Sequence, residues 1–166
     1  MIKDVLAQFY PAMCRRFNKP CKQIDIWDGG PGGEAEFVAK NFHIVERNKM
    51  FWLNLEKQSR PEDITFPIDY YITASPRFVR QLRVDWLKAM GFPAAPVVST
   101  VDKAMEMRVL GIDVLIDDSI KNLKSVRDAG MIAIQYVPDY MKVIDSDLNP
   151  ITHLSEVPDL LAQIRK

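Results

Sequence analysis

The sequence is poor in the residues that build disulfide frameworks, zinc sites and flexible linkers. Its 166 residues include only 2 cysteines, 2 histidines and 7 glycines. Cys14 and Cys21 are separated from His43 and His153 by spacings that fit no common zinc motif. The count allows one disulfide, but free thiols in a reducing cytosol are the simpler expectation.

The sequence also lacks an excess of either charge and a long apolar run. Lys and Arg together number 22, Asp and Glu also number 22, and the formal net charge is +0 at pH 7. A neutral chain has no overall field that attracts nucleic acid or an anionic membrane, so an anionic ligand needs a local site. No apolar stretch approaches the length of a membrane span, and the N-terminal residues lack a signal-peptide pattern. The sequence therefore predicts a cytoplasmic protein without nucleic-acid or membrane partners, and it leaves a homo-oligomer open.

What is present is the pattern of an α/β protein, most clearly after residue 66. Hydrophobic residues make up 48% of the chain, which is ordinary for a globular domain. Short β-branched and aromatic runs, separated by helical segments of about ten residues, predict strands at 69–73, 96–99, 114–116 and 131–134. Ser75 is predicted to cap the helix after the first strand, with Pro76 at the first helical position. This alternation predicts a parallel sheet that binds ligands beyond the carboxyl ends of its strands.

The first 66 residues are less regular and predict a helical cap rather than a second domain. Apolar residues at helical spacing indicate a helix within residues 5–17, and residues 34–47 are compatible with another. The apolar stretch 50–53 is explained equally well by an exposed interface or by packing of the cap on the core. We therefore divide the chain into a cap segment, 1–66, and an α/β core, 67–166.

Two adjacent carboxylates, Asp117 and Asp118, follow the predicted strand 114–116. Neighbouring acids at the end of a buried strand repel each other, and burial raises that cost. Capping of the next helix by Asp118 or Ser119 accounts for one of them. A hard cation such as Mg²⁺, which prefers oxygen ligands, explains the second.

Two other strand ends carry residues suited to phosphate binding. Thr73 ends the first predicted strand, and a hydroxyl beside the N–H groups of a helix N-terminus can hold a phosphate. Lys103, after the second strand, can neutralise phosphate charge. Taken singly, Thr73 is explained as a strand-end residue and Lys103 as a solvated lysine at a helix start.

Taken together, the threonine, the lysine and the Asp-Asp pair resemble, in order, motifs two, three and four of the haloacid dehalogenase-like superfamily. Residues 70–76, Tyr-Tyr-Ile-Thr-Ala-Ser-Pro, and residues 111–119, followed by Asn122, are similar to sequences of its 5′-nucleotidase-type members. The resemblance covers at least residues 69–136. It implies a Rossmann-like parallel sheet with a small helical cap, and Mg²⁺-dependent hydrolysis of a small phosphomonoester such as a nucleoside monophosphate. The implied phosphate-binding residues are Thr73, Ala74, Ser75 and Lys103, of which Thr73 and Lys103 also serve catalysis, and the implied metal ligands are Asp117 and Asp118.

The N-terminus resembles the first motif of 5′(3′)-deoxyribonucleotidases, but without its aspartates. Residues 5–9, Val-Leu-Ala-Gln-Phe, match the end of the family pattern Asp-x-Asp-Gly-Val-Leu-Ala-Asp-Phe. A gapless comparison places the aspartates at Met1 and Lys3 and the glycine at Asp4, and the preceding strand is absent. In the family the first aspartate attacks phosphorus, the second acts as general acid and base, and both help to hold Mg²⁺. The nucleophile is therefore not identified, unless residues upstream of Met1 supply it.

A second pair of aspartates, Asp25 and Asp28, precedes a glycine-rich stretch. Their spacing is one residue too long for the family motif and no apolar strand precedes them, so they are the weaker catalytic candidates. The sequence thus supports two hypotheses, a Mg²⁺-dependent phosphatase with a nucleophile supplied from elsewhere, and an inactive module that binds a phosphate ligand or a protein partner. A third, plainer hypothesis is a structural or assembly protein that uses the fold as a scaffold.

Overall fold

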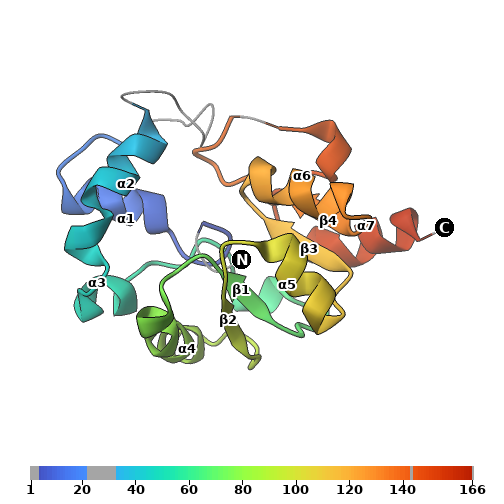
Figure 1. Ribbon diagram of the computed structural model, residues 1–166, viewed down its shortest axis with the longest axis horizontal. Coiled ribbons are helices and arrows are strands. Elements are labelled where there is room, and N and C mark those ends of the chain that lie inside the picture. The colour runs from blue at the N-terminus through green and yellow to red at the C-terminus, as the bar shows by residue number, and fades with distance from the viewer. Residues whose placement is uncertain (1–3, 22–32, 143, 166) are drawn as a thin grey trace.

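The computed structural model describes residues 4–21, 33–142 and 144–165. The longer helices and the strands are arranged with the N-terminal helices on one side of the strands and the C-terminal helices on the other (Figure 1). The helices are α1 (Phe9–Arg16), α2 (Glu34–Val45), α3 (Lys49–Leu53), α4 (Arg80–Ala89), α5 (Lys103–Leu110), α6 (Ile120–Asp128) and α7 (Val157–Ile164). The strands are β1 (Tyr71–Thr73), β2 (Val97–Ser99), β3 (Val114–Asp117) and β4 (Ile132–Gln135).

The strands pair in parallel, as the βαβ pattern predicts, but in two separate pairs. Strand β1 pairs with β2, from Tyr71 opposite Val97 onward, and β3 pairs with β4. Within the described ranges these pairs form two two-stranded sheets rather than one continuous sheet. The protein is therefore a mixed α/β structure with short parallel sheets.

Local sequence explains where several of these elements begin and end. Helix α5 stops at Gly111, whose φ of 68° lies in the left-handed region that glycine adopts without steric cost. Helix α6 begins at Ser119, whose hydroxyl accepts the backbone N–H of Asn122. The prediction of a cap at this point is confirmed for Ser119, and not for Asp118.

The predicted cap at Ser75 is wrong. The segment after β1 enters a 3-10 turn, Arg77–Val79, which leads directly into α4, and Pro76 precedes that turn. Ser75 instead turns back toward the strand, because its backbone N–H lies 3.3 Å from Thr73 Oγ1. The 3-10 turn therefore begins one residue, and the α-helix four residues, after Pro76, the first helical position that the sequence predicts.

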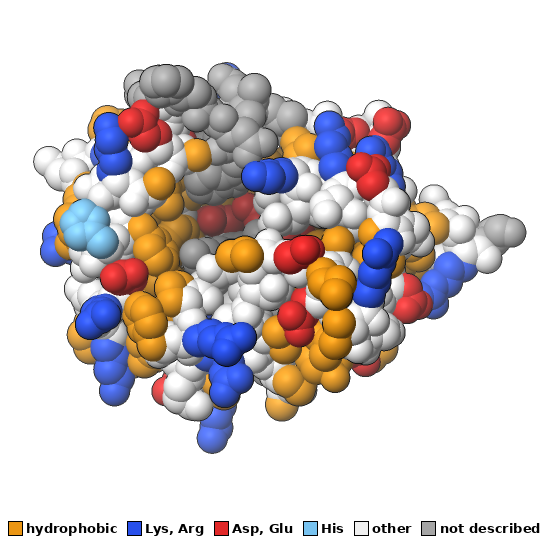
Figure 2. Space-filling view, in the orientation of Figure 1, with side chains coloured by type: hydrophobic (Ala, Val, Ile, Leu, Met, Phe, Trp, Pro, Cys, Tyr) orange, Lys and Arg blue, Asp and Glu red, His pale blue; other side chains and the backbone are white. Residues whose placement is uncertain are grey.

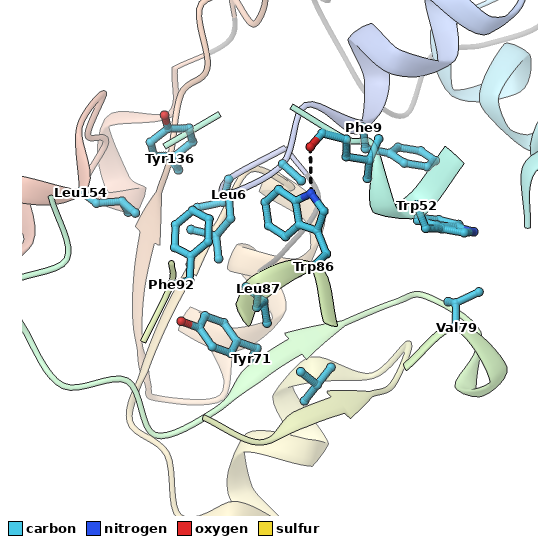
Figure 3. Packing of buried hydrophobic residues seen from close by; sticks show 14 of the residues in the cluster. Leu6, Phe9, Trp52, Tyr71, Val79, Trp86, Leu87, Phe92, Tyr136 and Leu154 are labelled. Atoms are coloured by element: carbon cyan, nitrogen blue, oxygen red, sulfur yellow. Dashed lines mark hydrogen bonds between the residues drawn. The ribbon is translucent and has the colours of Figure 1, made fainter. Parts of the chain in front are cut away.

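Aromatic side chains join α1 to α3, and the segment after α3 to α4. Phe9 of α1 stacks on Trp52 of α3, with ring centroids 5.6 Å apart and planes 14° from parallel. Trp86 of α4 donates its indole N–H to the carbonyl of Leu55, 2.8 Å away (Figure 3). Trp52 is fully buried whereas the neighbouring Met50 is largely exposed, so the apolar stretch 50–53 packs one side on the core and leaves the other open.

None of the helices in the described part of the chain is long and apolar enough to cross a membrane.

Candidate functional site

The four residues that the sequence singles out stand at the carboxyl ends of the strands. Thr73 is the last residue of β1, Asp117 is the last residue of β3 and Asp118 follows it, while Lys103 opens α5 after β2. All four are at most 3% exposed. Charged side chains are almost never buried to this extent unless they are paired. The burial of Lys103, Asp117 and Asp118 therefore requires favourable electrostatic interactions.

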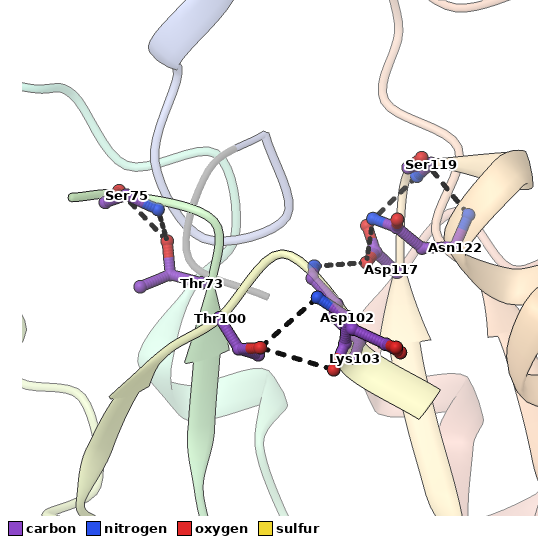
Figure 4. A network of polar contacts seen from close by, with 8 residues as sticks. All are labelled: Thr73, Ser75, Thr100, Asp102, Lys103, Asp117, Ser119 and Asn122. Atoms are coloured by element: carbon purple, nitrogen blue, oxygen red, sulfur yellow. Dashed lines mark hydrogen bonds and ion pairs between the residues drawn. The ribbon is translucent and has the colours of Figure 1, made fainter. Parts of the chain in front are cut away.

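Asp117 is held by three donors from three directions (Figure 4). Lys103 Nζ and Asn122 Nδ2 donate to its Oδ2, the latter at 3.1 Å, and the backbone N–H of Ser119 donates to Oδ1 at 3.0 Å. Burial alone would raise the pKa of Asp117, but the charge of Lys103 and the hydrogen bond from its ammonium group help to hold that pKa below its usual value. Asp117 and Lys103 therefore form a buried ion pair.

Asp118 experiences the opposite shift. Burial raises the pKa of Asp118 well above its usual range, and the negative charges of Asp117 and Asp4 add to that effect. A carboxyl group in this position gains from a cation, because a positive charge relieves both the desolvation and the repulsion. The two adjacent carboxylates therefore have pKa shifts of opposite direction.

The hydroxyl groups at the end of β1 form a separate small network. Thr73 Oγ1 lies 3.0 Å from Ser75 Oγ, and Figure 4 shows both on the side of the site opposite Asp117. Between the two groups Asp102 caps α5 by accepting the Met105 N–H at 3.0 Å, which fixes the start of the helix that carries Lys103. The carboxyl ends of the strands therefore carry hydroxyl groups at the end of β1 and a charged cluster at the start of α5 and the end of β3.

Sequence reasoning missed two residues that the structure brings to this region. Asp4 is buried, has a φ of 55° and accepts hydrogen bonds from the Tyr10 backbone N–H and the Tyr140 hydroxyl. Burial first and then the charge of Asp4 raise the pKa of Tyr140 well above its usual value. A signal was available for Asp4, because it occupies the glycine position of the motif that the N-terminus resembles, where a left-handed backbone is natural.

The structure buries a second cation in addition to Lys103. Arg83 of α4 is fully buried, and its guanidinium carbon lies 4.2 Å from the centre of the Trp52 ring. None of its three nitrogens has a hydrogen-bond acceptor among the described residues. Burial lowers the pKa of Arg83 to about 9, although the charge of Asp4 acts in the opposite direction. Nothing in the sequence distinguishes Arg83 from the exposed charges of the same helix.

Figure 2 shows a hollow between the N-terminal helices and the α5–α6 side, with acidic side chains inside it and apolar side chains along one wall. The weaker candidates, Asp25 and Asp28, lie outside the residues that the structure describes, as do Met1 and Lys3. In the described ranges no three His, Cys, Asp or Glu side chains form a metal-binding group. Asp117 and Asp118 still fit Mg²⁺, which commonly takes one or two carboxylates and completes its shell with waters and substrate phosphate.

Compared with known proteins, the chain matches no family model, no curated protein and no solved structure.

Proposed function

We propose that the carboxyl edge of the strands binds a divalent cation and the phosphoryl group of a small phosphomonoester, in a protein of the haloacid dehalogenase-like type. The observation that carries this proposal is the buried cluster of Lys103, Asp117 and Asp118, three charged side chains together at the strand ends. The cluster sets two adjacent carboxylates against one ammonium group, and Asp118 carries a raised pKa beside Asp117. A divalent cation bound together with a phosphate would balance the second negative charge.

Each residue has a chemical role in this proposal. Asp117 and Asp118 supply carboxylate oxygens to Mg²⁺, which when bound neutralises charge on the phosphoryl oxygens. Lys103 adds a compact positive charge from α5, and its ion pair with Asp117 keeps its ammonium group in place. Thr73 and Ser75 offer hydroxyl groups, and Ala74 offers a backbone N–H, from the end of β1. The arrangement binds and orients the phosphoryl group.

Hydrolysis needs a nucleophile that these residues do not provide. In the resemblance, the aspartates that attack phosphorus and move protons fall at Met1 and Lys3, whose side chains have no carboxylate. A module that binds a nucleotide or another small phosphate without turnover is therefore the second candidate. Hydrolysis of a nucleoside monophosphate is proposed for a chain in which an aspartate is supplied before Asp4.

One set of measurements distinguishes the phosphatase from the binding module. Phosphate release from a panel of deoxynucleoside monophosphates is followed with and without Mg²⁺, and the shift in unfolding temperature caused by Mg²⁺ plus inorganic phosphate is measured in parallel. We expect a temperature shift and no measurable turnover for the sequence as printed. The Asp117→Ala variant should lose the shift, whereas Asp128→Ala, an exposed acid on the adjacent helix, should keep it.

Each outcome has a defined meaning. Turnover that disappears with Asp117→Ala would establish the enzyme and refute the binding module. Binding without turnover would support the module. The absence of any Mg²⁺- or phosphate-dependent shift in the parent chain would refute both.

A further inference from the structure

Helix α5 carries an exposed apolar stripe along its outer side. Val101, two residues before the helix, Met105 and Val109 recur every four residues and therefore lie on one face. They are 85%, 58% and 70% exposed, and Val101 and Val109 are the most exposed large apolar side chains in the described part of the chain. Figures 1 and 2 show α5 on the surface turned toward the viewer, with apolar side chains over it. These three residues, the α5 stripe, form a row of the kind that marks an interface, whereas scattered apolar residues do not.

The opposite side of α5 is already buried, so the stripe cannot turn inward. Ala104 and Met107 pack in the core, and Lys103 forms the buried ion pair with Asp117. Rotation of the helix to bury the stripe would expose these residues and break the pair. Covering the stripe therefore requires a surface that packs on α5 from outside.

Charged side chains of opposite sign flank the stripe. Successive positions on a helix are about 100° apart, so Asp102 and Glu106 lie along one side of the stripe and Arg108 lies along the other. Arg108 donates one long hydrogen bond, 3.4 Å to the carbonyl of Ala129. No ion pair between described residues involves Glu106 or Arg108. The outer face of α5 thus has an acidic side, an apolar centre and a basic side.

This face is complementary to a second copy of itself. Ridges of residues four apart pack along one another when two helices cross at about −50°, the commonest class of helix packing. A two-fold axis along the α5 stripe brings the apolar residues of the two copies together and exchanges the two sides. Asp102 and Glu106 then face Arg108 of the second copy, as an isologous interface requires. The formal net charge of +0 adds no overall repulsion between copies. We propose that the protein forms a two-fold dimer in which the α5 stripes of two copies pack against each other.

The size of this contact determines how the dimer must be measured. A contact confined to one helix from each copy is small beside the roughly 1,200–2,000 Å² that a specific, stable interface buries. The dimer is therefore weak and depends on concentration. Sedimentation equilibrium from about 10 to 500 µM covers the range expected for so small an interface, and it should show a monomer that converts to a dimer.

Met105, at the centre of the stripe, provides the first test. Met105→Glu places two like charges across the axis and should raise the dissociation constant of the dimer by at least about tenfold. Met50→Glu is the matched control, because Met50 lies on α3 at a similar exposure, 61%, and it should leave association unchanged. Urea midpoints show whether each variant stays folded. Equal weakening by both changes would overturn the assignment to α5.

The charged sides of the stripe test the orientation of the axis. Glu106→Arg and Arg108→Glu each set like charges against one another and should each weaken the dimer, whereas the double variant exchanges the two signs and should recover most of the affinity. An axis across the stripe would instead set each charge against its own counterpart, and neither single change would then weaken association. That result, or a double variant as weak as the single variants, would overturn the proposed axis.

A chain that stays monomeric over the whole concentration range would overturn the dimer itself. None of these measurements involves phosphate or Mg²⁺, and none of the variants changes a residue of the candidate site. The result is therefore independent of the proposed function.

Discussion

Two buried cations, Lys103 of α5 and Arg83 of α4, have different surroundings. Lys103, at the strand ends, has a carboxylate partner that is itself held by two further donors. Arg83 has the Trp52 ring against its guanidinium and no hydrogen-bond acceptor among the described residues. The first arrangement offsets the desolvation of charge by pairing, and the second leaves most of that cost in place. Burial of a charge is therefore not evidence of a stabilising interaction, and its partners decide the outcome.

The largest expected effect comes from breaking the paired cation. Asp117→Ala leaves Lys103 buried without its carboxylate and should lower the free energy of unfolding by about 3–5 kcal/mol, measured by urea denaturation. The double variant Lys103→Met/Asp117→Leu removes both charges and should recover most of that loss. A double variant as unstable as Asp117→Ala would contradict an electrostatic origin of the effect.

Replacing Arg83, the cation without a hydrogen-bond acceptor among the described residues, should change the free energy of unfolding in the opposite direction. Arg83→Met keeps an extended apolar side chain against Trp52 and removes a buried charge without an acceptor. It should raise the free energy of unfolding by about 1–3 kcal/mol. Arg80→Met, on an exposed position of the same helix, is the matched control and should change stability little. A loss of stability in Arg83→Met would show that the guanidinium makes an interaction that stabilises the fold.

Asp118, next to Asp117, makes the stability of the fold depend on pH. Because the folded-state pKa of Asp118 lies well above its unfolded value, this carboxyl favours the fold below about pH 4, and the favourable contribution is lost as pH rises. Asp118→Asn should therefore be more stable than the parent at pH 7, with the difference closing toward pH 4. Urea midpoints at several pH values measure this, and a difference independent of pH would refute the shifted pKa.

The smallest effect is expected at a surface cation. Lys124 Nζ lies 3.3 Å from Asp145 Oδ2, and its side chain is half exposed. Solvent screens such a pair, so Lys124→Gln should change the free energy of unfolding by about 0–0.5 kcal/mol in thermal or urea denaturation. An effect as large as that of Asp117→Ala would mean that burial does not explain the difference in stability between the two ion pairs.

The sequence predicts the strands well, because apolar runs between turn residues determine them locally. The predicted strand 114–116 corresponds to β3, which extends it by one residue, Asp117. The separation into two sheets was not evident, since it depends on what lies between β1 and β3. The start of the helix after β1 was misplaced because Ser75 has a competing acceptor close by, the Thr73 hydroxyl.

The site was predictable only in part, for a similar reason. Asp117, Asp118, Thr73 and Lys103 follow strands, and strand ends meet at one edge. Arg83 carries no sequence signal, because an arginine in an amphipathic helix is usually solvated. The bond between Asp4 and Tyr140 joins residues 136 positions apart, and no local pattern encodes such a contact.

That long-range bond has a consequence for biosynthesis. At roughly 5–20 residues per second, Tyr140 is made roughly 7–27 seconds after Asp4. Throughout that interval the Asp4 carboxylate lacks one of the hydrogen-bond donors that the finished fold supplies. Because the charge of Asp4 contributes to the raised pKa of Asp118, the electrostatics of the strand-end cluster are complete only after residue 140, beyond the last strand, has been made.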